Sequence, residues 1–138
     1  MATKSKGLDI SLLVVRIVAG GLMLMHGIHK LLHGFEPIKN MLHTAKLPEY
    51  LWIGVPLGEI VAPVLLILGI CCRLSATLFF GTMLMSMYLA FGWHSFALTQ
   101  TGGIVAELNI LYAIVSFTIM LVGKGKYSLQ KKDTWFWG

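Results

Sequence analysis

Three ionisable residues stand within stretches of the chain that are otherwise apolar. They are Arg16, Glu59 and Glu107. A charged side chain in the hydrocarbon of a membrane costs roughly 2.5–3.5 kcal/mol on insertion scales, so such residues usually face a neighbouring helix and a polar partner. The three residues therefore predict a polar site that is enclosed between membrane-spanning helices.

The positions of Arg16 and Glu59 predict an ion pair. Counting ~1.5 Å per residue from the outer helix ends puts Glu59 about 12 Å deep and Arg16 about 18 Å deep. An arginine side chain can cover that difference. Pro63 cannot donate to the carbonyl of Glu59, so we also expect the helix to bend there. The alternative for Arg16 is that it only holds helices together, without a role in binding or chemistry.

Further polar residues are expected at the outer mouth of this site. Glu107 begins the last apolar stretch, at the level of His26 and Lys30 near the end of the first. The alternative for Glu107 is a solvated carboxylate at a helix start, where the helix dipole favours negative charge. The predicted site residues are Arg16, His26, Lys30, Glu59 and Glu107, with His29, His94, Tyr88 and Tyr112 as accessory candidates.

Metal and thiol chemistry are not favoured by the sequence. His26, His29 and His33 could line one helix face, and imidazoles bind zinc, copper or haem iron. However, the chain has no HExxH, no CxxCH and no second dense pair of ligands. We therefore expect neither a metal nor haem. Cys71 and Cys72 are adjacent rather than in the CxxC arrangement of thiol oxidoreductases, so we interpret them as inert apolar residues.

Composition places these residues in a membrane protein. The 138-residue chain is 57% hydrophobic and only 12% charged, whereas a typical soluble domain has about 25% charged residues. A spanning helix needs about 20 mostly apolar residues. The stretches of suitable length are 8–28, 51–72, 75–93 and 104–123. The sequence thus predicts one domain over 1–138, an all-α integral membrane four-helix bundle.

The longest connection between the predicted spans runs from Lys30 to Tyr50. Its apolar residues recur at helical spacing, and Pro37 stands at a plausible first helical position. We expect a short amphipathic helix on the outer membrane surface, the alternative being a partly ordered loop. Beyond the fourth span, the basic tail 124–138 ends in Trp135, Phe136 and Trp137, which suit the membrane–water interface.

The distribution of Lys and Arg predicts the orientation. The side of the two termini holds Lys4, Lys6, Arg73, Lys124, Lys126, Lys131 and Lys132, and the other side holds Lys30, Lys39 and Lys46. Cytoplasmic segments carry the excess of Lys and Arg, so we expect a multi-pass protein of the bacterial inner membrane with both termini cytoplasmic. The net charge of +5 suits contact with anionic lipid rather than nucleic acid.

A series of short motifs makes the chain resemble the DoxX family of small bacterial membrane proteins. The motifs are Leu13-Val14-Val15-Arg16, His26-Gly27-Ile28-His29-Lys30, Gly58-Glu59, Gly69 with Arg73, Glu107, and Gly123-Lys124-Gly125-Lys126-Tyr127-Ser128-Leu129. The resemblance covers nearly the whole chain. Two positions depart from the family pattern: Gln130 stands where an Asp is usual, and His29 occupies a variable position.

The resemblance implies a four-helix bundle linked to membrane oxidoreductase systems, including thiosulfate:quinone oxidation and thiol or oxidative-stress complexes. The expected function is a subunit of, or accessory to, a quinone- or thiol-linked redox system. If it is an enzyme, it is a quinone-linked oxidoreductase subunit. A quinone, the candidate cofactor, needs apolar walls and one or two polar groups, which His26, Glu107, Tyr88 or Tyr112 could supply. Expected partners are the lipid bilayer, a redox partner protein and a second copy of the chain. The alternatives are a small-molecule or proton transport protein and a non-catalytic structural subunit.

Overall fold

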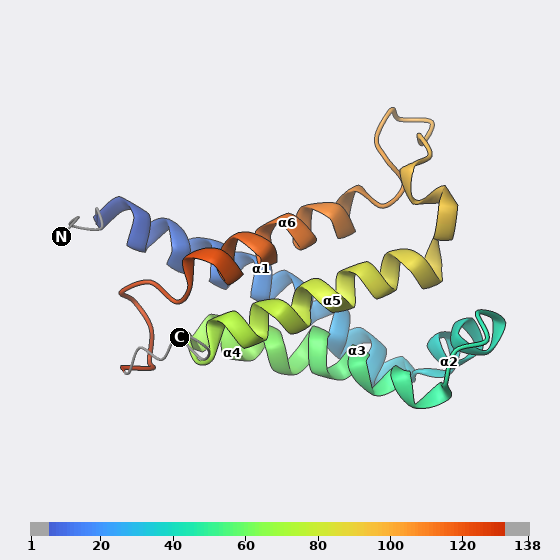
Figure 1. Ribbon diagram of the computed structural model, residues 1–138, viewed down its shortest axis with the longest axis horizontal. Helices are drawn as coiled ribbons and strands as arrows, with labels where there is room; N and C mark the ends of the chain where they lie inside the picture. The colour runs from blue at the N-terminus through green and yellow to red at the C-terminus, as the bar shows by residue number, and fades with distance from the viewer. Residues whose placement is uncertain (1–5, 132–138) are drawn as a thin grey trace.

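The computed structural model describes residues 6–131, which form four antiparallel passes along one long axis (Figure 1). The passes are α1 (Lys6–His33), the continuous run from η1 to α4, α5 (Cys72–Ala90) and α6 (Glu107–Val122). The start of α1 and the end of α6 lie at the same end of the molecule, here called the terminal end. The opposite end, here called the loop end, carries α2 (Glu36–Thr44) and η3 (Gly92–Phe96).

The second pass changes its helical geometry around Glu59. It comprises η1 (Glu49–Ile53), α3 (Gly54–Pro56), η2 (Leu57–Val61) and α4 (Ala62–Leu68). The segment η2 is a π turn, in which the amide of Ala62 bonds to the carbonyl of Leu57, five residues back. Pro63 has no N–H to offer the Glu59 carbonyl, so the ordinary helical bond cannot form there. A π turn thus occupies the position at which the sequence predicts a bend.

Three of the passes are long and apolar enough to cross a membrane. They are Lys6–His33, Glu49–Leu68 and Cys72–Ala90, with 28, 20 and 19 residues. The fourth pass, α6, is apolar but has 16 residues, fewer than the roughly 20 that a full span needs. The structure therefore supports an all-α membrane bundle, while a fourth complete span remains a prediction.

The ends of two predicted spans differ from the structure. The first helix continues past residue 28 to His33. The second helix stops at Leu68, because Gly69 adopts a left-handed conformation with φ 74°. Cys72 is consequently the first residue of α5 and not the last residue of the second span.

Small residues on α1 let the second pass approach closely. A Cβ atom at Gly27 would lie 2.9 Å from the carbonyl carbon of Glu59, and one at Gly20 would lie 3.0 Å from the carbonyl oxygen of Pro63. Small residues play this role at helix contacts in membranes. Gly27 therefore brings α1 against η2, and Gly20 brings it against α4.

The connection after α1 contains the helix α2, with Pro37 in its first turn. Leu42 on this helix is buried. Lys39 donates a 2.9 Å hydrogen bond to Glu36, and this bond raises the pKa of Lys39. A helix in this connection agrees with the sequence analysis, whereas its position on the outer membrane surface remains a prediction.

Candidate functional site

A buried carboxylate and a lysine from two different passes form the centre of the candidate site. Glu59 lies in the π turn η2 and is 2% exposed. Lys30, near the end of α1, places its Nζ 2.5 Å from Glu59 Oε1, and its side chain is 33% exposed. The second oxygen, Oε2, is buried and has no hydrogen-bond partner among residues 6–131. The carboxylate is therefore only half satisfied within the described structure.

The predicted Arg16–Glu59 ion pair is wrong. Arg16 is buried and donates instead to four backbone carbonyls, those of Leu66, Ile67, Lys124 and Tyr127. Helical side chains point toward the N-terminus of their helix. The guanidinium thus extends toward the terminal end, whereas Glu59 lies in the other direction, beside Lys30. Lys30 is about 21 Å further along α1 at ~1.5 Å per residue.

The carbonyls that Arg16 contacts belong to the last turn of α4 and to the segment after α6. The carbonyl end of a helix is the negative end of its dipole, so a cation is stabilised there. The Nε atom of Arg16 lies 2.8 Å from the Leu66 oxygen, and Nη1 lies 2.9 Å from the Tyr127 oxygen. This geometry matches the alternative reading of Arg16, in which it holds segments together.

Further hydrogen bonds fasten residues 124–130, here called the tail segment, to the ends of α1 and α4. The amide of Lys126 donates to Asp9 Oδ1 at 3.0 Å, and the amide of Leu129 donates to the Leu68 carbonyl at 3.1 Å. The side chain of Gln130 accepts from the amide of Cys71 at 2.7 Å. Three of the family-like motifs, around Arg16, Gly69 and Gly123–Leu129, thus meet in one structural unit.

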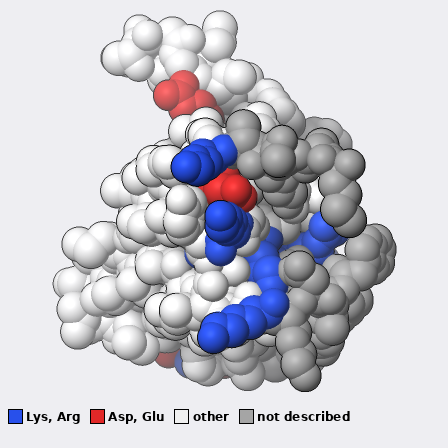
Figure 2. Space-filling model, turned by 90° about the vertical axis from the view of Figure 1, so that its left-hand side faces the viewer, with Lys and Arg blue, Asp and Glu red and all other residues white. Residues whose placement is uncertain are grey.

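Basic side chains gather at the terminal end of the molecule (Figure 2). The described basic residues of the segments at this end are Lys6, Arg73, Lys124, Lys126 and Lys131. Lys4, Lys132 and the aromatic residues Trp135, Phe136 and Trp137 lie outside the described residues. The described part of the chain therefore places the predicted charge excess on one end.

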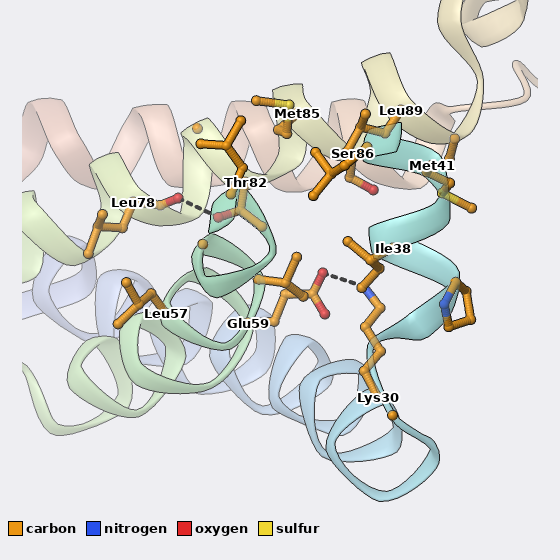
Figure 3. A pocket seen from close by; sticks show the side chains of 18 of the residues that line it. Lys30, Ile38, Met41, Leu57, Glu59, Leu78, Thr82, Met85, Ser86 and Leu89 are labelled. Atoms are coloured by element: carbon orange, nitrogen blue, oxygen red, sulfur yellow. Dashed lines mark hydrogen bonds and ion pairs between the residues drawn. The ribbon is translucent and has the colours of Figure 1, made fainter. Parts of the chain in front are cut away.

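An apolar cavity of about 520 Å³ opens beside the Lys30–Glu59 pair, between α2, the second pass and α5. Ile38, Leu57 and Met85 are among its apolar walls, and Figure 3 shows Glu59 and Lys30 pointing toward one another at its polar end. The polar residues on its α5 side include Thr82 and Ser86. Its volume lies in the range of small-molecule sites, about 300–1,000 Å³.

A second, smaller cavity of about 110 Å³ adjoins the same ion pair from the side of α6. Its lining shares Lys30, Glu59 and Ser86 with the apolar cavity. The other polar residues around it are His26, Asn109 and Tyr112. Glu59 thus borders both an apolar compartment and a polar one.

A comparison with known families decides what kind of protein carries this arrangement. The DoxX family model matches residues 11–93 of the chain, which is more than half of it. The chain belongs to the DoxX family. No curated protein and no solved structure matches it. Together with three helices of spanning length, the match identifies a multi-pass membrane protein of the DoxX family.

The matched region of this DoxX protein includes Lys30, Glu59 and the α5 wall of the apolar cavity. Of the other predicted site residues, His26 and Tyr112 line the small polar cavity. Arg16 and Glu107 line neither of these two cavities, and Glu107 is exposed at the start of α6. Four of the nine predicted residues therefore come together around Glu59.

The remaining accessory candidates of the DoxX chain lie elsewhere. His29 is exposed and stacks on His33, with ring centroids 4.1 Å apart. His94 is exposed in η3. Tyr88 lines a separate cavity of about 870 Å³ between α2, α5 and η3. Within residues 6–131, no group of three or more His, Cys, Asp or Glu side chains is placed to hold a metal ion.

Sequence reasoning missed several polar residues around the DoxX cavities. Thr82 and Ser86 are four apart on α5 and so share one helix face. A Cβ atom at Gly58 would overlap the Thr82 hydroxyl, so this face of α5 packs directly on the second pass. Hydroxyl residues at helical spacing within an apolar stretch were the available signal. Asn109 had no such signal, because it stands alone in the apolar sequence of α6.

Proposed function

We propose that this DoxX protein binds a quinone in the apolar cavity beside Lys30 and Glu59, as a subunit of or accessory to a membrane redox system. The observation that carries the proposal is the combination of apolar walls with one charged, hydrogen-bonding end. A quinone ring requires this combination, because its faces are apolar and its two oxygens need polar partners. Lys30 can supply such a partner, since an ammonium group has three donors and Glu59 uses one.

Electrons for a quinone would come from a partner protein. Cys71 and Cys72 are adjacent, and Cys72 is buried in the helix core, so they do not form the exposed thiol pair that an oxidoreductase needs. The expected setting is the bacterial inner membrane, with the basic terminal end in the cytoplasm and α2 on the outer surface. Other expected partners are the bilayer lipids and a second copy of the chain.

The experiment is equilibrium binding of a short-chain quinone to the purified protein in lipid nanodiscs, with empty nanodiscs as background. Gly81 lines the apolar cavity, and no atom lies within 4 Å of a Cβ atom built there. Gly81→Phe should therefore fill the cavity without breaking the fold, and should weaken binding at least about tenfold. Gly21→Phe is the matched control, because Gly21 lies on α1 with equally open surroundings and outside the cavity lining. Equal binding by both variants would contradict the proposal.

Proton or small-molecule transport is a second candidate function, because Glu59 borders a polar and an apolar cavity at once. Carboxylates inside membrane proteins often take part in proton relays. Proteoliposomes that carry an internal pH dye would test it. Proton uptake that is lost in Glu59→Gln and kept in Glu107→Gln would favour transport.

A further inference from the structure

At the polar end of the apolar cavity, one oxygen of the Glu59 carboxylate lacks a hydrogen-bond donor within residues 6–131. Glu59 Oε1 is paired with Lys30, but Oε2 is buried without a partner among the described residues. A buried acceptor without a donor is energetically costly, and natural structures rarely leave one. Glu59 as a whole is 2% exposed, so bulk water does not compensate for the missing bond. The arrangement thus suits a ligand that carries a donor.

The hydroxyl of Thr82 strengthens this donor requirement. Thr82 Oγ1 donates its proton to the carbonyl of Leu78 at 2.9 Å (Figure 3). A hydroxyl group has one proton and two lone pairs. Thr82 therefore offers only acceptor capacity to a molecule in the cavity. Glu59 on the second pass and Thr82 on α5 both line the cavity, and each can contribute an acceptor to it.

The two redox forms of a quinone differ in this respect. A quinone carbonyl only accepts, so it can bind Lys30 but leaves Glu59 Oε2 unpaired. A hydroquinone hydroxyl both donates and accepts, so one group can donate to Oε2 and accept from Lys30. The Lys30 side chain is one-third exposed, which gives it the freedom to turn and admit the hydroxyl to the enclosed oxygen. The reduced head group thus satisfies both members of the ion pair.

We infer that the cavity selects the hydroquinone form of its ligand over the quinone form, through Glu59 as hydrogen-bond acceptor. This inference rests on the proposed function, since it concerns the same cavity and ligand class. It assigns Glu59 a role in ligand specificity and requires no electron transfer by this chain. A protein with this preference would hold a reduced carrier, so a partner would either deliver hydroquinone to it or oxidise hydroquinone bound in it.

The test compares decylubiquinol with decylubiquinone on the wild-type protein in anaerobic nanodiscs, again corrected for empty nanodiscs. We expect the Kd for the quinol to be lower by about tenfold, the effect of one buried acceptor gaining a donor. Equal affinities, or tighter quinone binding, would overturn the inference and leave the proposed function intact. Failure of both molecules to bind would overturn the proposed function, and the inference with it.

Substitution of Glu59 links the preference to the carboxylate. Glu59→Gln keeps the shape but replaces one oxygen by an amide donor, so the preference should fall to nearly onefold or reverse. Glu107→Gln makes the same chemical change at an exposed residue outside the cavity lining, and should keep the wild-type ratio. If Glu59→Gln does not fold, Thr82→Val removes the second acceptor at nearly constant shape and should reduce the ratio. An unchanged ratio in a folded Glu59→Gln protein would contradict the assignment to Glu59.

Discussion

Lys30 and Glu59 form an ion pair across two passes, with Nζ and Oε1 2.5 Å apart, although 29 positions separate them in the sequence. The pair joins the loop end of α1 to the π turn of the second pass. Because Glu59 is buried and Lys30 is partly exposed, losing one partner has a different effect from losing the other. Loss of the lysine strands a buried charge, whereas loss of the carboxylate leaves a cation that can reach solvent.

This inequality predicts different costs for the two single substitutions. Lys30→Met should destabilise the protein by about 3 kcal/mol, the lower end of the range for breaking a buried pair. Glu59→Gln should cost less, and the double variant should be milder than the sum of the two. Unfolding in mixed detergent micelles, followed by circular dichroism, measures these differences. Lys46→Met is the control, since Lys46 is exposed in the connection after α2. If the cost of the double variant equalled the sum of the two single costs, Lys30 and Glu59 would not be energetically coupled.

Arg16 should resist replacement by lysine. A guanidinium can donate to four carbonyls at once, as it does here, whereas an ammonium has three donors and no planar fork. Arg16→Lys should therefore loosen the tail segment, and the amides of Lys126 and Leu129 should exchange with deuterium faster. Hydrogen exchange with mass spectrometry in nanodiscs measures this. Lys131→Arg, at an exposed position, should leave exchange unchanged. If the amides of Lys126 and Leu129 exchanged as slowly in Arg16→Lys as in the wild type, Arg16 would not be what holds the tail segment in place.

Gly69 and Gly54 form a matched pair for testing the end of α4. Gly69 has φ 74°, and a Cβ atom there would lie 2.5 Å from Arg16 Nη2. Gly54 has φ −59° and open surroundings. Gly69→Ala should lower the free energy of unfolding by roughly 1–3 kcal/mol, whereas Gly54→Ala should be neutral or stabilising by up to ~1 kcal/mol. The same detergent titration measures both. Equal effects would show that the left-handed turn is not strained by a side chain.

The orientation in the membrane can be tested with reporter fusions. The basic residues of the terminal end predict that this end is cytoplasmic. A fusion after Gly138 should be active with a cytoplasmic reporter, and a fusion after Asn40 in α2 should be active with a periplasmic one. Cytoplasmic activity from the Asn40 fusion would reverse the predicted topology.

Most of the fold can be predicted from the sequence, because long apolar stretches and small residues are visible in the sequence itself. The three long passes follow from their runs of apolar residues, and the close approach of α1 follows from Gly20 and Gly27. The irregular turn at Glu59 could be anticipated because Pro63 removes one specific hydrogen bond. The second helix was predicted too long, since hydropathy continues past Gly69 although its backbone conformation ends the helix.

The candidate site was harder to predict, because polar partners in a membrane need not be side chains. Arg16 binds backbone carbonyls, and carbonyls are present at every residue, so no sequence pattern marks them. A search for an acidic partner therefore selected Glu59, whose own partner is Lys30. Helical side chains point toward the N-terminus of their helix. Applied to Arg16 and Lys30, this rule would have favoured the partners that the structure shows.

The tether between Arg16 and the tail segment also constrains how the protein is made. Two of the carbonyls that Arg16 contacts belong to Lys124 and Tyr127, which follow it by 108 and 111 residues. During synthesis, the first helix must enter the membrane long before these acceptors exist. Until residues 124–127 have been synthesised, Arg16 therefore lacks two of the four carbonyls to which it donates. A chain that stops before Lys124 therefore lacks two of the four carbonyls that satisfy the buried arginine of its first helix.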